Sequence, residues 1–182
     1  MVQKIRWPYD DNDENNAGIR LIATVDGVHC RIFEPRLDPG TQWYSHKVNG
    51  PALGYELAVD MHSNQLVWIN GPFPAGESDI TVFRKPNGLK DKIPHGKKVV
   101  ADKGYRGEPD KISVPNTHDS LIASAYKKRA RSRHETFNQR IKSFNIMKEQ
   151  FRHGVARHQI AFEVVCILIQ YDIENDHPLF QI

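Results

Sequence analysis

The feature that most constrains the fold of this chain is a succession of four short apolar runs, rich in β-branched residues, within its first 70 residues. The runs cover residues 21–25, 29–33, 53–59 and 65–69. Asp26-Gly27 separates the first two runs, and a polar turn at residues 62–64 separates the last two. Because two apolar runs flanking a short turn signal are typical of a β-hairpin, we expect two successive antiparallel hairpins.

The second half of the chain changes to helical periodicity. After a Gly- and Pro-rich break at residues 71–76, Ser78 or Asp79 is placed to cap a short helix. One more apolar run follows at residues 97–101, and we expect it to be a central strand. Helix-compatible runs then extend over residues 120–148 and 155–174. The predicted order is β-β-β-β-α-β-α-α, an α/β fold with a mixed five-stranded sheet, leading antiparallel strands and flanking helices.

Length and composition indicate one domain. The 182 residues, 39% of them hydrophobic, can bury a core without disulfides or metals. The longest apolar stretch, residues 164–169, is far shorter than the roughly 20 residues that span a bilayer. With only Cys30 and Cys166, and with no recognisable secretion signal, we expect a reducing compartment. We predict a polar arm at residues 1–19, the folded domain at residues 20–175 and a C-terminal tail at residues 176–182.

The charge is unevenly distributed. The net charge is +3, yet residues 127–157 contain ten Lys or Arg against two acids, a local balance of +8, so that the rest of the chain sums to −5. Such a block is the pattern expected for a polyanionic partner, because each neutralised phosphate releases counterions. A solvated helix face is the alternative interpretation.

The first long helix carries two distinct faces at 100° per residue. The apolar face, which we expect to pack on the sheet, comprises Ala130, Phe137, Ile141 and Phe144. The polar face lies about 130° away and comprises Arg131, Glu135, Asn138 and Lys142. The Glu135 carboxylate, flanked by an amide and cations, suits the last ligand of a metal site that cleaves phosphodiesters. The simpler interpretation is an ion pair between Arg131 and Glu135 on the helix surface, which stabilises the helix by about 0.2–0.5 kcal/mol. In the second long helix we expect core positions at Val164, Val165, Leu168 and Ile169.

Two aspartates follow predicted strands. Asp26 comes directly after residues 21–25, and Asp102 comes directly after residues 97–101. Each is also a common turn residue. If the two strands are neighbours, however, both acids converge with Glu135 of the following helix, and such an oxygen-rich set suits Mg²⁺ or Mn²⁺. Two such ions would support phosphodiester hydrolysis or strand transfer.

Four segments, taken in order, resemble the DDE transposases of the insertion-sequence and Harbinger types. They are Val25-Asp26-Gly27, residues 71–79, Ala101-Asp102-Lys103-Gly104-Tyr105 and residues 131–142. The most specific are the Asp-x-Gly-Tyr turn and the Arg-x-x-x-Glu-x-x-Asn-x-x-Ile-Lys helix, and the resemblance extends over residues 21–170. It implies a ribonuclease H-like fold in which Asp26, Asp102 and Glu135 are the catalytic metal ligands, holding two Mg²⁺ or Mn²⁺ ions.

Five side chains of the basic helix are candidates for contacts with DNA. They are Arg131, Arg133, Asn138, Arg140 and Lys142. Arg131, Arg133 and Lys142 are expected at phosphates. Asn138, Arg140 and Lys142 either contact DNA or position the helix. Asp79 falls where the related transposases often carry His-Asp. Here Ser78 stands in place of that His, so we interpret Asp79 as a helix cap and not as an accessory residue of the site.

The resemblance implies a metal-dependent DNA endonuclease or transposase catalytic domain. The alternative is a catalytically silent, domesticated DNA-binding or scaffold protein derived from a transposase. Complete transposases usually place a helical DNA-binding domain ahead of the first Asp, whereas 25 residues precede Asp26 here. We therefore expect a separate DNA-binding subunit or a homodimer as partner, no membrane association, and residence in the nucleus of a eukaryote or the cytoplasm of a bacterium.

Overall fold

The computed structural model describes residues 21–182, and the arm predicted at residues 1–19 lies outside this range. The strands are β1 (Leu21–Arg31), β2 (Tyr44–Ser45), β3 (Gly50–Asp60), β4 (Leu66–Pro74), β5 (Lys98–Val100) and β6 (Ile112–Ser113). The α-helices are α1 (Asp79–Phe83), α2 (Leu89–Lys92), α3 (Leu121–Ser143), α4 (Asn145–Lys148) and α5 (Val155–Asn175), and the 3-10 helices are η2 (Thr41–Trp43) and η3 (Lys103–Tyr105). Within residues 21–182, each helix is too short or too polar to cross a bilayer.

The strands of residues 21–182 form a six-stranded mixed sheet rather than the five-stranded sheet predicted. The order is β2-β3-β1-β5-β6, with β4 also paired to β3. The β3–β4 pair confirms the second predicted hairpin, and the internal position of β5 confirms the expectation for that strand. β1 is antiparallel to β3 and parallel to β5, which makes the sheet mixed.

The first predicted hairpin is wrong, because Asp26-Gly27 lies inside one continuous strand. β1 pairs with β3 without a break from Ala23 to Arg31, so that Asp26 is opposite Leu57 and Gly27 is opposite Glu56. The uninterrupted ladder of backbone hydrogen bonds outweighs the local turn preference of an Asp-Gly pair.

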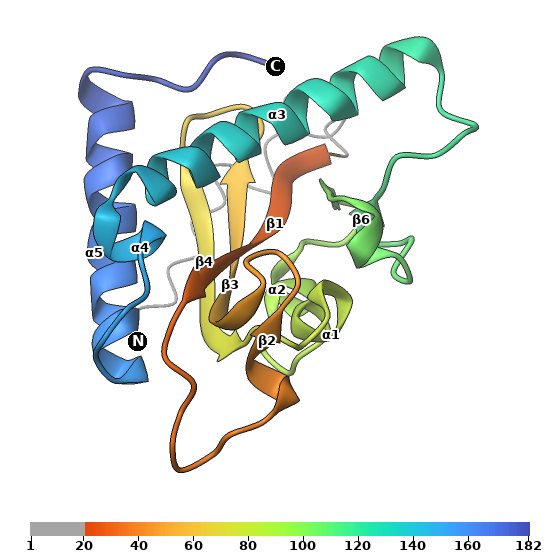
Figure 1. Cartoon of the computed structure of the whole chain (residues 1–182). Helices are drawn as coiled ribbons and strands as arrows, with labels where there is room; N and C mark the ends of the chain where they lie inside the picture. Colours follow the sequence, from red (N-terminus) through yellow and green to blue (C-terminus); the bar gives the residue numbers. More distant parts are fainter. Residues whose placement is uncertain (1–20) are drawn as a thin grey trace.

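Helices cover both faces of the sheet (Figure 1). α3 packs against β1 and α5 packs against β4, while α1 contacts η3 and β3 on the opposite face. The alternation of β1 explains the two cores: Val28 and Cys30 belong to the cluster with α3 and α5, whereas Ala23 and Val25 belong to the other cluster. The side chains of Thr24, Asp26 and Val28 therefore lie under α3.

The apolar face predicted for α3 is confirmed. Ala130, Phe137 and Ile141 are completely buried, and Phe144 packs half-buried against the same core. The helix is shorter than the predicted residues 120–148, because Phe144 has extended backbone angles that end α3 and precede α4.

The core predicted for α5 is correct at only two of its four positions. Val165 and Ile169 are buried, whereas Val164 and Leu168 are about half exposed. An α-helix presents one side to the sheet, and apolar residues at consecutive positions cannot all lie on that side. α5 therefore retains an apolar face that the rest of residues 21–182 leaves uncovered.

Candidate active site

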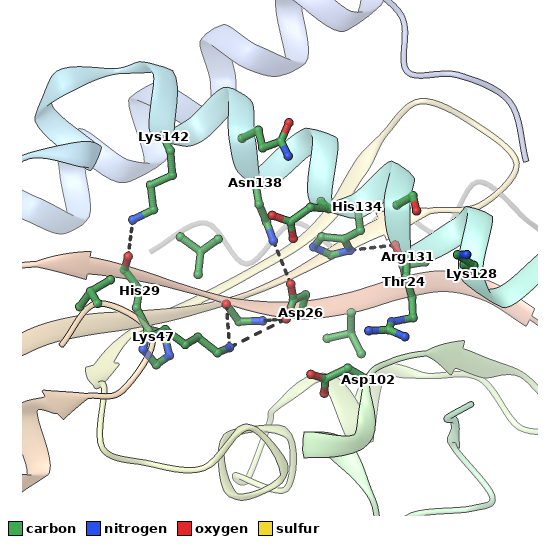
Figure 2. Close-up of a pocket in the computed structure, with 17 residues that line it drawn as sticks. Thr24, Asp26, His29, Lys47, Asp102, Lys128, Arg131, His134, Asn138 and Lys142 are labelled. Atoms are coloured by element: carbon green, nitrogen blue, oxygen red, sulfur yellow. Dashed lines mark hydrogen bonds and ion pairs between the residues drawn. The ribbon is translucent and has the colours of Figure 1, made fainter. Parts of the chain in front are cut away.

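A cavity of about 660 Å³ opens between β1, the end of β5 and α3. All three predicted acids, Asp26, Asp102 and Glu135, line it. The complete polar face predicted for α3 lines it as well, namely Arg131, Glu135, Asn138 and Lys142. Figure 2 shows Asp26 on β1 and Asp102 on the segment that follows β5, with the side chains of α3 above Asp26. The fold thus brings together residues that are 76 and 33 positions apart in the sequence.

The register of two parallel strands explains why the aspartates meet. β1 and β5 pair with Thr24 opposite Val100. Asp26 lies two residues further along β1, and Asp102 lies two residues beyond Val100 at the end of β5, so the register directs both aspartates to the same edge of the sheet. Asp102 then caps η3, where its Oδ1 accepts a 2.7 Å hydrogen bond from the Gly104 N–H.

Asp26 is held in place from two sides. Its Oδ1 accepts a 2.8 Å hydrogen bond from the Gly27 N–H, and its Oδ2 accepts a 2.9 Å hydrogen bond from Asn138 Nδ2. Asn138 is buried, and its Oδ1 has no hydrogen-bond partner within residues 21–182. The amide therefore orients one carboxylate and keeps an oxygen acceptor unused in the cavity wall.

Glu135 lies on the exposed side of α3 at the cavity rim. Within residues 21–182, no three His, Cys, Asp or Glu side chains are close enough to form a ready-made metal-binding group. The three predicted acids therefore share one cavity without sharing one coordination sphere.

Lys47 lines the cavity and Asp79 lies beside it; the sequence interpretation passed over Lys47 and assigned Asp79 to helix capping. Ser78, not Asp79, caps α1. Lys47 Nζ lies 3.6 Å from Asp79 Oδ2 and 4.0 Å from Asp26 Oδ1, and it donates a 3.1 Å hydrogen bond to the Gly27 carbonyl. Burial raises the pKa of Asp79; the Lys47 ammonium opposes this shift, while Asp26 and Asp102 add to it. The ammonium thus lies between the carboxylates of Asp79 and Asp26, and Figure 2 shows its contact with Asp26.

Two glycines allow Asp79 to approach the predicted ligands. A Cβ at Gly27 would lie 2.7 Å from Asp79 Oδ1, and a Cβ at Gly104 would lie 2.9 Å from Asp79 Oδ2 and 3.0 Å from Asp102 Oδ1. Those last two oxygens are therefore within about 6 Å of each other, since each lies about 3 Å from the same point. The glycines after Asp26 and Asp102 were the signal in the sequence that another group approaches here.

His134 is a further residue of the site that sequence reasoning missed. It is completely buried between α3 and β1, and its Nδ1 lies 2.8 Å from Thr24 Oγ1. Thr24 Oγ1 also lies 3.3 Å from the Val59 carbonyl oxygen, so its hydroxyl group links His134 to β3. Burial lowers the pKa of His134, with Asp26 opposing the shift, which favours the neutral imidazole. Nε2 has no hydrogen-bond partner within residues 21–182.

The five candidate DNA-contact residues separate into two groups. Arg131, Asn138 and Lys142 line the cavity, and Arg131 is exposed there. Asn138 donates a hydrogen bond to Asp26, and Lys142 donates one to the His29 carbonyl. Arg133 is instead buried and donates to the turn between β3 and β4, at Asp60, Ser63 and Asn64. Arg140 binds Asp172 and the His177 carbonyl. These two arginines lie outside the cavity lining and hold the fold together.

Comparison with known protein families places most of this chain in one family. The family model described as DDE superfamily endonuclease matches residues 25–170, a span that includes Asp26, Asp102 and Glu135. The comparisons with curated proteins and with solved structures gave no match. The matched span covers most of the chain and ends within α5. The chain therefore belongs to the DDE superfamily endonucleases, a family of nuclease and transposase type.

Proposed function

We propose that this chain is a divalent-metal-dependent DNA endonuclease or transposase catalytic domain with a ribonuclease H-like fold. Asp26, Asp102 and Glu135 serve as its metal ligands. The observation that carries the proposal is their convergence: one acid on β1, one that follows the neighbouring parallel strand β5 and one on α3 line a single cavity.

The chemistry of the donor set fits Mg²⁺ or Mn²⁺. The three acids supply only carboxylate oxygens, which hard divalent cations prefer, and Asn138 Oδ1 adds an unused oxygen acceptor beside Asp26. The position of the Lys47 ammonium between Asp26 and Asp79 shows that the carboxylates already attract a cation. When bound, two such ions activate the attacking hydroxyl and stabilise the leaving oxygen. The acids must move closer together to hold them.

The protein residues position the ligands and the DNA. Asn138 fixes the orientation of the Asp26 carboxylate, and Gly104 leaves space where the Asp79 and Asp102 carboxylates approach. Lys128 and Arg131 at the cavity rim offer cationic groups to phosphates. In hydrolysis the oxygen of water bonds to phosphorus as one P–O ester bond breaks; in strand transfer a 3′-hydroxyl replaces the water.

DNA is the proposed substrate, and we propose that recognition of specific ends requires a further DNA-binding subunit or a second copy of the chain. The proposed compartment is the nucleus of a eukaryotic host or the cytoplasm of a bacterial one. A catalytically silent scaffold is the competing function, and metal binding separates the two, because an ion that binds only the folded state must raise its melting temperature.

The decisive experiment is nicking of supercoiled plasmid with millimolar Mn²⁺ or Mg²⁺. We expect Asp102→Asn to lower the rate by a factor of about 100 or more, because it removes one charged ligand of a catalytic metal. Asp110→Asn, at an exposed acid outside the cavity, is the matched control and should retain full activity. Nicking by folded Asp102→Asn at the wild-type rate would exclude Asp102 as a ligand. Wild-type protein without nicking or Mn²⁺-dependent stabilisation would favour the scaffold.

A further inference from the structure

The outer face of α5 exposes large apolar side chains. Five residues each leave between 48% and 66% of their surface accessible, namely Ile160, Val164, Ile167, Leu168 and Tyr171. The inner face of the same helix is fully used, since Phe162, Val165, Cys166, Ile169 and Ile173 are buried in the core. Single exposed apolar residues are normal on a protein surface, whereas five on one helix face indicate an interaction site.

The exposed face has the spacing of a coiled-coil seam. Its residues, with the exposed charges at both ends, alternate by three and four positions: Arg157, Ile160, Val164, Ile167, Tyr171 and Glu174. This is the 3.5-residue period that keeps one stripe facing a partner helix. The seam from Arg157 to Glu174 spans about 26 Å at 1.5 Å per residue.

The stripe is complementary to itself when reversed. In an antiparallel pair of α5 helices centred between Val165 and Cys166, Ile160 faces Tyr171 and Val164 faces Ile167 of the other copy. The same arrangement places Arg157 opposite Glu174 at both ends. A parallel pair would instead place like charges opposite each other. Two-fold symmetry requires this kind of self-complementary surface.

We infer that two copies of this chain associate through the outer face of α5, as an antiparallel helix pair with Arg157–Glu174 ion pairs at its ends. Among residues 21–182, the lining of the active-site cavity includes no residue of α5, so this association leaves the cavity of each copy open. The inference does not depend on nuclease activity. A seam with few apolar layers is small for a protein interface, and we expect dissociation at micromolar concentrations.

Sedimentation velocity from about 1 to about 200 µM tests this surface, with the expected dissociation falling inside that range. We expect wild-type protein to change from monomer to dimer and Ile167→Glu to remain a monomer. Ile146→Glu, at an exposed apolar residue of α4, is the matched control and should dimerise normally. Circular dichroism establishes that each variant is folded. Wild-type protein that stays monomeric throughout, or folded Ile167→Glu that dimerises normally, would overturn the inference.

Charge exchange tests the antiparallel orientation. Arg157→Glu and Glu174→Arg should each weaken the dimer, because each places like charges together at both ends. The double variant should restore wild-type association, since it only exchanges the partners. If neither single variant differs from wild type, the antiparallel pairing is wrong.

Discussion

Replacing Glu56 by Gln should make the protein more stable at alkaline pH. Glu56 lies on β3 with 2% of its surface exposed, and its Oε2 accepts a 2.9 Å hydrogen bond from Trp68 Nε1. Its Oε1 has no hydrogen-bond partner within residues 21–182. Burial raises the pKa of Glu56 from 4.5 to about 8; the Trp68 hydrogen bond opposes this shift and Asp79 adds to it. The folded protein therefore holds a neutral carboxyl group at this position at pH 7.

The size and sign of the effect follow from proton linkage. Below pH 4.5 the carboxyl is protonated in both states, so its contribution to stability is fully present. Between pH 4.5 and about 8 the unfolded chain loses the proton while the folded chain keeps it. The free energy of unfolding then falls by about 1.4 kcal/mol per pH unit, which gives an upper limit of about 5 kcal/mol over this range. Gln cannot ionise, and its side-chain oxygen still accepts the Trp68 N–H.

Urea unfolding of wild type and Glu56→Gln at several pH values between 5 and 8, in EDTA, measures this difference. We expect the two proteins to be similar near pH 5 and the variant to gain several kcal/mol over wild type by pH 8, approaching the upper limit of about 5 kcal/mol. Glu149→Gln, at an exposed acid, is the control and should follow wild type. A difference between wild type and Glu56→Gln that stays constant across this range would refute the assignment of a buried neutral carboxyl.

Two further predictions concern the cavity. Lys47→Met should lower the Mn²⁺ concentration needed for half-maximal thermal stabilisation. The Lys47 ammonium lies 3.6 Å from Asp79 and 4.0 Å from Asp26, where it competes with a divalent cation. If the variant needs a higher Mn²⁺ concentration, this competition does not occur. Arg131→Ala should reduce the salt dependence of DNA binding, the slope of log K against log[NaCl], by about one for the phosphate contact it loses. Arg140→Ala is the comparison and should leave that slope unchanged, since Arg140 contacts Asp172 and lies outside the cavity; equal slopes for both variants would exclude Arg131 from the DNA path.

Local periodicity was sufficient to predict α3 and its two faces. The positions of side chains around a helix follow from sequence spacing alone, so the buried stripe and the four cavity-lining residues could be predicted without the fold. The same applies to the β3–β4 hairpin and to the start of α1, which depend on neighbouring residues, although the cap of α1 is Ser78 and not Asp79.

The remaining features of the fold and of the site depended on which elements meet in space. Asp26-Gly27 has the local preference of a turn, yet pairing with β3 keeps it extended, and only the β1–β5 register places Asp26 beside Asp102. Lys47 and Asp79 join the site because the chain folds back onto Gly27 and Gly104, where the absent side chains leave room. Val164 and Leu168 are as apolar as Val165 and Ile169, and packing against the sheet alone decided which pair is buried. Sequence determines local geometry, whereas burial and proximity between distant residues arise only when the elements pack together.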